Sequence, residues 1–211
     1  MPNRTEIQAD FSDTPGSPRG EQRRRRILQA LHDCVIDSGF AKTTLADIAR
    51  AADMSPSHLL YYFDGKDAIL EDYFDSVAAR IRARIDGFRD EPVKRQVDLL
   101  ADLFFGGKGI TRSEIGFMLE CFGAAVHDSK LREYKTELDR FCKAYLQELF
   151  RQAPNRTASA KDCAEVAYAM LIGLRTAAYF DQRLALPQAR RLFRGQVRNL
   201  AQGGRTAAKT L

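Results

Sequence analysis

Two helix starts in close succession constrain the fold of this chain more than any other feature. Thr44 is followed three residues later by an aspartate, which is the arrangement of a capping box at the start of a helix. Ser55 followed by Pro56 marks a second helix start, because serine caps helices well and proline is tolerated at the first helical position. The first helix is therefore predicted to end near Ala52, with a tight turn over residues 53–55 before the second.

The second of these helices is predicted to span residues 56–63, before Asp64-Gly65 interrupts it. Leu59 and Phe63 are four residues apart, so they lie on one face of a helix, which we expect to be buried. The outward side chains are then Ser57, His58, Tyr61 and Tyr62. A supporting helix over residues 21–38 precedes the pair. Two short helices joined by a tight turn form a helix-turn-helix, whose second helix places its first residues in the major groove of DNA.

The outward side chains of this motif have the chemistry that DNA contacts use. Hydroxyl groups can bond phosphates or base edges, and aromatic rings can contact the methyl group of thymine. Helix N-termini attract phosphate, and Thr44, Ser55 and Lys66 each lie at a predicted helix start. Two alternatives stay open at this point: both tyrosines can cap the protein core, and the histidine can be a surface residue without a contact.

The stretch TTLADIARAADMSPSHLLYYFDGKDAIL resembles the DNA-binding segment of the TetR family of bacterial repressors, and the match is strong over residues 20–75. The matching positions are Thr44, Asp47-Ile48-Ala49, Ser55, Tyr61-Tyr62-Phe63 and Lys66. The resemblance implies that Tyr61, Tyr62 and Lys66 contact DNA.

Three positions depart from the family pattern. Asp53 stands in the turn where glycine is usual, and aspartate tolerates the left-handed conformation better than most residues do. Leu60 stands where the family has a DNA-contacting tyrosine, so we expect no polar contact from it. Tyr62 replaces the usual histidine.

Charge permits a polyanionic partner without proving one. The net charge is +5 and the isoelectric point about 9.1. The charge is concentrated in an unbroken run from Arg23 to Arg26 and in residues 190–211, which contain no acid. The arginine run begins the helix that supports the motif. It is expected to attract phosphates in a salt-dependent way, or else to be a solvated helix start.

The rest of the chain is predicted to be helical, because no sustained alternation of apolar and polar residues marks a strand. We expect an all-α protein of about nine helices. The remaining helices are predicted over residues 66–88, from 93, 113–127, 131–149, from 159 and from 187. The predicted domains are a disordered arm (1–18), a helix-turn-helix DNA-binding domain (19–66), an effector-binding and dimerisation domain (67–203) and a basic tail (204–211).

Several classes of protein are not supported by the sequence. No apolar run reaches the roughly 18 residues of a membrane span, and no secretory signal opens the chain, so a cytoplasmic protein is expected. The four cysteines form no C-x-x-C motif, and the three histidines are not paired at ligand spacing, so neither a metal nor a cofactor is expected. The cysteines are expected to be buried thiols, with a redox switch as the alternative. No hydrolase, P-loop or metalloprotease motif is present, so an enzyme is not expected.

The segment CAEVAYAMLIGLRTAAYFDQRL is apolar nearly all the way round its predicted helix and must be covered on both sides. The next helix is expected to have one apolar face, with arginines opposite. That apolar face consists of Leu192, Phe193, Gln196, Val197 and Leu200. The two helices resemble the four-helix dimer interface of the TetR family, which implies a homodimer through residues 160–182 and 187–201. A twofold dimer implies a near-palindromic operator.

The TetR resemblance also implies a pocket for a small-molecule effector in the larger, aromatic-rich half of the chain. The candidate residues are Phe104, Phe117, Cys121, Phe122, Tyr145, Arg175 and Tyr179. Ordinary core packing is the alternative for each of them. Arg175 is a charge within an apolar helix and needs a partner. That partner is Glu120, an acid across the dimer, or an anionic ligand.

Together these observations predict a DNA-binding transcriptional regulator. The expected protein is a repressor that an effector releases from its operator by shifting the helix over residues 66–88. A ligand-independent DNA-binding protein and an activator of the same fold are the alternatives.

Overall fold

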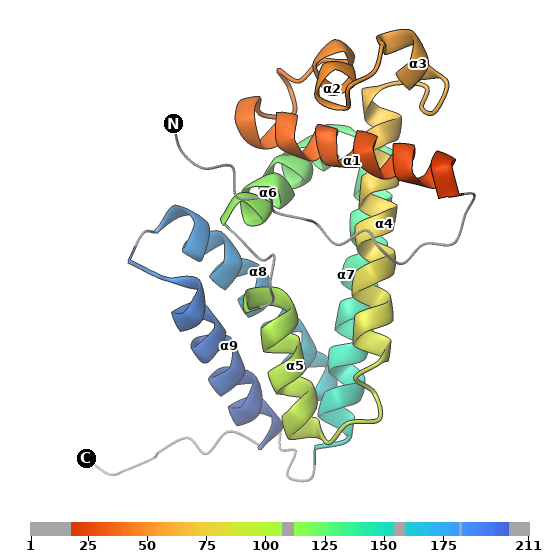
Figure 1. Ribbon diagram of the computed structural model, residues 1–211. Coiled ribbons are helices and arrows are strands. Elements are labelled where there is room, and N and C mark those ends of the chain that lie inside the picture. The colour runs from red at the N-terminus through yellow and green to blue at the C-terminus, as the bar shows by residue number, and fades with distance from the viewer. Residues whose placement is uncertain (1–17, 107–111, 154–158, 182, 203–211) are drawn as a thin grey trace. The chain divides into compact units, whose positions relative to one another are not determined.

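The computed structural model describes residues 18–106, 112–153, 159–181 and 183–202, and these residues form helices and no strand (Figure 1). The all-α prediction is confirmed. The helices are α1 (Pro18–Ser38), α2 (Leu45–Ala51), α3 (Pro56–Leu60), α4 (Lys66–Asp86), α5 (Val93–Phe105), α6 (Arg112–His127), α7 (Ser129–Arg151), α8 (Ala160–Phe180) and α9 (Leu186–Ala201). The predicted N-terminal arm up to residue 17 and the basic tail lie outside the described residues.

The predicted caps of the short helices are present. The Thr44 hydroxyl accepts a hydrogen bond from the amide of Asp47, and the Asp47 carboxylate accepts one from the amide of Thr44, which completes the capping box. Ser55 caps α3 by accepting from the amide of His58 at 3.1 Å. The turn between α2 and α3 places Asp53 at a φ of 57°, the left-handed conformation expected there.

Some helix boundaries differ from the prediction. Helix α1 begins at Pro18 rather than Glu21, and α4 ends at Asp86 rather than residue 88. Helix α3 ends at Leu60 rather than Phe63. The amides that follow bond three residues back, Tyr61 to His58 and Tyr62 to Leu59, which is the pattern of a tighter turn.

The start of α4 at Lys66 agrees with the prediction. The carbonyl of Gly65 accepts the amide of Ile69 at 3.2 Å, so Gly65 is the residue before the helix.

Backbone contacts divide the chain into two compact units. The first unit contains residues 1–77 and 116–134, and the second contains 78–115 and 135–211. Helices α4, α6 and α7 therefore each supply residues to both units. The boundary predicted at residue 66 separates a DNA-binding domain from an effector-binding domain by their functions. A division by backbone contacts does not test that boundary.

The first unit has its own core beneath the helix-turn-helix. Side chains of α1, α2, α3, α4 and α6 build it, and those with no exposed surface include Ile27, Leu31, Ile48, Leu59, Ile69 and Leu70. Because α3 has only five residues, it holds its place through this packing rather than through its own hydrogen bonds.

The second unit packs α9 against both α5 and α8 (Figure 1). Phe193 and Val197 of α9 are buried there with Phe105 and Phe150. The four cysteines of the chain are free thiols; Cys34 is partly exposed and the other three are buried.

The prediction for the two faces of α9 is partly wrong. The arginines of α9 lie beside its buried stripe, because Arg190 pairs with Asp102, and Arg194 and Arg198 pair with Asp98 at 3.9 and 2.5 Å. Those aspartates lie on α5, so the arginine side of α9 faces α5. Leu192 and Gln196, which were expected on one apolar face with Phe193 and Val197, are exposed, whereas Phe193 and Val197 are buried within the second unit.

No helix within the described ranges is long and apolar enough to cross a membrane, and no cluster of potential metal ligands was found among those same residues.

Candidate nucleic-acid interface and ligand cavity

Helix α3 presents one buried and one exposed side, as its spacing predicts. Leu59 has no exposed surface and Phe63 is 6% exposed, whereas Tyr61 is 82% exposed. Ser57 is also exposed. The alternative in which Tyr61 caps the core is therefore wrong. Leu60, at 49% exposure, is an apolar side chain on the same surface.

His58 is held in place by an arginine from α1. The Nη1 atom of Arg23 lies 3.0 Å from Nε2 of His58. Arginine can only donate, so this contact requires Nε2 to accept, and the proton of the neutral ring is then on Nδ1. The imidazole also lies against the ring of Tyr62, with 5.6 Å between centroids, and Tyr62 meets Tyr61 edge-on at 5.3 Å. The three rings form a continuous aromatic surface.

Tyr62 and Lys66 have structural partners as well as a place on this surface. Tyr62 is half-buried and packs against the core of the first unit. The Nζ atom of Lys66 donates to the carbonyl of Phe40 at 2.9 Å and lies 4.2 Å above the Phe40 ring. The amide of Phe40 in turn donates to Glu120 at 3.1 Å. An ammonium group has three donors, so Lys66 keeps N–H groups for a phosphate while it anchors the loop between α1 and α2.

The hydroxyl groups of Thr44 and Ser55 are engaged in the helix caps. The Thr44 hydroxyl also donates to the Asp47 carboxylate at 2.5 Å. This bond and the one from the Thr44 amide together hold the pKa of Asp47 below its usual value. The two residues therefore fix where α2 and α3 begin.

The basic run at the start of α1 makes contacts within the first unit. Arg24 pairs with Asp72 at 3.0 Å and lies 4.5 Å above the ring of Phe63. Arg26 lies 3.6 Å from the carboxylate of Asp53 in the turn. With the contact between α1 and His58, these side chains tie α1 to α3, to α4 and to the turn. No local sequence pattern predicts these partners, because they lie far away along the chain.

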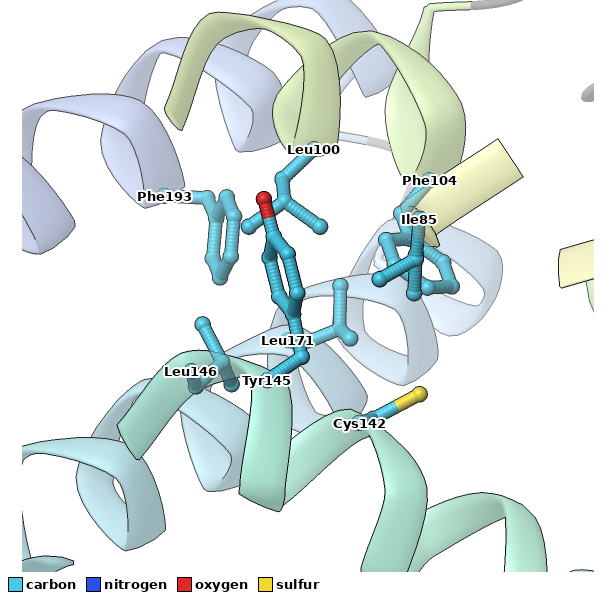
Figure 2. Close-up of a pocket in the computed structure, with 8 residues that line it drawn as sticks. All are labelled: Ile85, Leu100, Phe104, Cys142, Tyr145, Leu146, Leu171 and Phe193. Carbon is cyan, nitrogen blue, oxygen red and sulfur yellow. The ribbon is translucent and has the colours of Figure 1, made fainter. Parts of the chain in front are cut away.

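A small apolar cavity lies in the second unit. Its volume is about 10 Å³, which is close to the minimum for one water molecule. The residues around it are Ile85, Leu100, Phe104, Cys142, Tyr145, Leu146, Leu171 and Phe193 (Figure 2). The Tyr145 hydroxyl donates to Oε1 of Gln96 at 2.7 Å, and burial raises the pKa of Tyr145. The cavity is therefore apolar and nearly closed.

The structure divides the predicted effector residues between the two units. Phe104 and Tyr145 line the cavity. Phe117 and Cys121 belong to the core of the first unit, and Phe122 lies on the part of α6 assigned to that unit. Most of the cavity lining was not among the residues predicted from the sequence; it includes Phe193, whose apolar stripe was interpreted as part of a dimer face.

Arg175 belongs to the second unit and has no carboxylate in direct contact among the described residues. Its guanidinium lies 5.8 Å from the ring centroid of Phe104, and its Nε atom is buried without a hydrogen-bond partner there. Burial lowers the pKa of Arg175 to about 10, and the charge of Glu114 partly opposes that shift. Glu120, the expected partner, instead accepts the amide of Phe40. Tyr179 lies one turn further along α8, with the Arg112 guanidinium 5.4 Å from its ring.

The helix-turn-helix and the larger helical body are those of a DNA-binding regulator of transcription. The chain belongs to the TetR family: a family model described as bacterial regulatory proteins of the tetR family matches residues 27–73, and one described as BetI-type transcriptional repressor, C-terminal, matches residues 93–202. The family resemblance of the sequence is confirmed, and the similar proteins are transcriptional regulators rather than enzymes.

Similar proteins of known sequence include the HTH-type transcriptional regulator BetI 1 of Chromohalobacter salexigens, which is 29% identical over 160 residues, 72% of this chain and 76% of the relative. The regulator BetI of Escherichia coli is 23% identical over 141 residues, 64% of this chain and 72% of the relative.

Solved structures with the same fold include a transcriptional regulator of Saccharomonospora viridis in complex with choline. It has a TM-score of 0.74 at 19% identity and covers 84% of this chain and 96% of its own. The fatty acid degradation regulator FadR of Bacillus halodurans also has a TM-score of 0.74, at 16% identity, with coverage of 91% and 99%. At these identities the likeness shows the fold alone.

Proposed function

We propose that this protein binds a near-palindromic operator as a homodimer, represses transcription in the cytoplasm, and leaves the operator when a small-molecule effector binds. The observation that carries the proposal is the exposed ring of Tyr61 at the end of a short, capped helix whose opposite side is fully buried. A large aromatic side chain so exposed on a helix-turn-helix is explained by a DNA partner.

The DNA contacts are proposed for the outer surface of α3 and its neighbours. Ser57, His58 and Tyr61 are placed at base edges or adjacent phosphates, and Tyr62 extends the aromatic surface beside them. The ammonium group of Lys66 donates one hydrogen bond to the carbonyl of Phe40, and its remaining N–H groups are proposed to contact a phosphate. Thr44 and Ser55 are proposed to lie at the DNA backbone, where their caps fix the helix starts.

The dimer is proposed to form through the exposed side of α8 and α9. Val166, Phe180 and Leu192 are 49%, 68% and 44% exposed, which leaves apolar surface uncovered on adjacent helices. Gly173 and Gly195 lie in the interiors of α8 and α9, where a glycine costs about 1 kcal/mol relative to alanine. A Cβ atom at either glycine would meet open space within the chain, so nothing in one protomer requires glycine there. Glycine at these two positions is explained if the backbone of a second copy of the chain approaches them closely.

Release by an effector is proposed to use helices that belong to both units. Helix α4 begins at Lys66, which holds the carbonyl of Phe40, and α6 contains Glu120, which holds the amide of the same residue. A shift of α4 or α6 in the second unit therefore changes contacts that position the helix-turn-helix. A ligand can drive that shift only as far as it binds the released state better.

Selection of operators from random duplex DNA with the purified full-length protein, at near-physiological salt, tests the proposal. An enriched inverted repeat is expected. A bound pool without an enriched sequence would show that the protein binds DNA only nonspecifically, and it would refute the proposal of a specific operator.

The dimer has a separate test by light scattering. Gly173→Leu is expected to give a folded monomer. Gly123→Leu is the matched control, because Gly123 is an exposed helix glycine of the first unit, and this variant is expected to remain dimeric. Loss of the dimer in both variants would count against the assigned interface.

Choline is the comparison ligand for effector release, because it is bound in the structure of the Saccharomonospora viridis regulator. Titration of choline against the operator complex tests it directly. Retention of the operator at saturating choline would exclude it as the effector while leaving operator binding in place.

A further inference from the structure

Arg175 lies on the inward side of α8. Tyr168 and Leu171, two turns and one turn earlier on that helix face, are buried, and Leu171 lines the cavity. Val166 and Gly173 are exposed and lie on the opposite side, which is the side proposed for the dimer. The guanidinium therefore points into the second unit and is not placed to meet an acid across that dimer.

Carboxylates near this part of α8 are already engaged. Asp139 accepts the hydroxyl of Tyr168 and pairs with Lys135. Glu165 pairs with Lys143 at 2.6 Å. Glu114 acts on Arg175 through its charge.

The side chain of Arg175 is half-buried, and its Nε atom is buried. A partly buried cation without a direct counter-charge carries an energetic cost, because no carboxylate replaces the hydration that it loses. Natural proteins keep such groups where function requires them. The guanidinium is a planar fork of donors that matches a carboxylate with two parallel hydrogen bonds. Among the described residues, no side chain accepts a hydrogen bond from the buried Nε atom of Arg175, so this donor is left for a ligand.

Two residues that line the apolar cavity lie close to Arg175. They are Leu171, one turn before Arg175 on the same face, and Phe104, whose ring centroid is 5.8 Å from the guanidinium. The site thus has a charged end and an apolar end. Because the cavity holds about 10 Å³, its lining must move apart to admit more than a water molecule.

We propose that the second unit binds a small amphipathic carboxylate, with its carboxylate on Arg175 and its apolar part in the cavity between Phe104 and Leu171. The proposal rests on the proposed function, because it names the chemical class of the effector. A quaternary ammonium of the same size is disfavoured, since it would bring a second positive charge next to that of Arg175.

Three probes with the same eight-carbon chain test the class of ligand: octanoate, octyltrimethylammonium and 1-octanol. Each is titrated into the full-length protein by isothermal calorimetry, below its aggregation concentration. Octanoate is expected to bind most tightly, and the cation least. Tighter binding of the cation or of the alcohol than of octanoate overturns the proposal, and so does the absence of octanoate binding.

The role of Arg175 is tested with Arg175→Met, which keeps the length of the side chain and removes its charge. Loss of a charge-assisted contact is expected to weaken octanoate binding roughly ten- to hundredfold while leaving 1-octanol unchanged. Arg84→Met, at an exposed arginine of α4 in the second unit, is the control and is expected to bind like the parent. Removal of an unpaired buried charge should leave the melting temperature equal or higher, so a folding defect would be visible separately. Unchanged octanoate affinity in folded Arg175→Met refutes the assignment.

Operator binding separates this inference from the proposed function. An enriched operator without octanoate binding refutes the ligand class and leaves the regulator intact. Octanoate binding that depends on Arg175 supports the ligand class even where no operator is enriched, and in that case the proposed function fails alone.

Discussion

Tyr61 and Leu59 are two residues apart, and the structure assigns them opposite roles. Tyr61 is 82% exposed and Leu59 has no exposed surface. Replacing each by alanine should therefore separate DNA recognition from folding. Tyr61→Ala is expected to weaken operator binding and leave the fold intact, whereas Leu59→Ala is expected to destabilise the first unit.

The magnitudes follow from burial. A surface substitution changes stability by about 0.5 kcal/mol or less, while deletion of a fully buried leucine side chain costs roughly 2–5 kcal/mol. For a chain of this size that corresponds to a melting temperature lower by roughly 4–20 °C for Leu59→Ala. A homodimer loses two copies of Tyr61, so at about 1 kcal/mol for each hydrogen bond the operator affinity should fall by about 2 kcal/mol, or roughly thirtyfold.

Fluorescence polarisation on the selected operator and thermal melting followed by circular dichroism measure the two effects. Tyr61→Phe is included because it removes the hydroxyl and keeps the ring, and it therefore divides the loss between a hydrogen bond and apolar contact. The reasoning is refuted if Tyr61→Ala melts as early as Leu59→Ala, or if it binds the operator like the parent protein.

Three further predictions follow from buried and exposed groups elsewhere. Tyr145→Phe leaves the buried Oε1 atom of Gln96 without its 2.7 Å donor and should lower stability by about 1–3 kcal/mol in a thermal melt; an unchanged melting temperature would contradict the bond. Gly173→Leu should abolish the dimer in light scattering without unfolding the chain, and a stable dimer would exclude close helix approach at that point. Iodoacetamide should modify Cys34 faster than Cys121 at mildly alkaline pH. Burial raises the pKa of both thiols, but Cys121 is the more deeply buried, so it has less thiolate at a given pH, and equal labelling in peptide mass spectra would refute this order.

Local patterns in the sequence were enough to predict the helix-turn-helix. Thr44 and Ser55 cap the helices because capping depends on residues three positions apart. Leu59 and Tyr61 take the predicted sides because burial along one helix follows its period. These interactions join residues that are only a few positions apart in the sequence, and the tertiary contacts of the first unit agree with them.

Contacts between distant segments could not be predicted in the same way. The arginines of α9 were expected opposite its apolar face, with no partner named, but Asp98 and Asp102 of α5 pair with them and fix the rotation of the helix. Aromatic composition likewise could not assign Phe117 to the core of the first unit and Phe104 to the cavity of the second, because both occur on amphipathic helices with similar neighbours.

The small volume of the cavity sets the sensitivity of the proposed sensor. An occupant larger than a water molecule must first open a lining that includes Phe104, Leu171 and Phe193, so the apparent dissociation constant contains the free energy of opening as well as that of contact. If the open form is one molecule in a hundred, the concentration needed for half-release is about a hundred times the intrinsic dissociation constant. A closed cavity of this kind makes a high-threshold detector, which ignores trace amounts of its ligand and responds when the ligand becomes abundant. Substitutions that loosen the lining would lower that threshold without touching the DNA-binding surface.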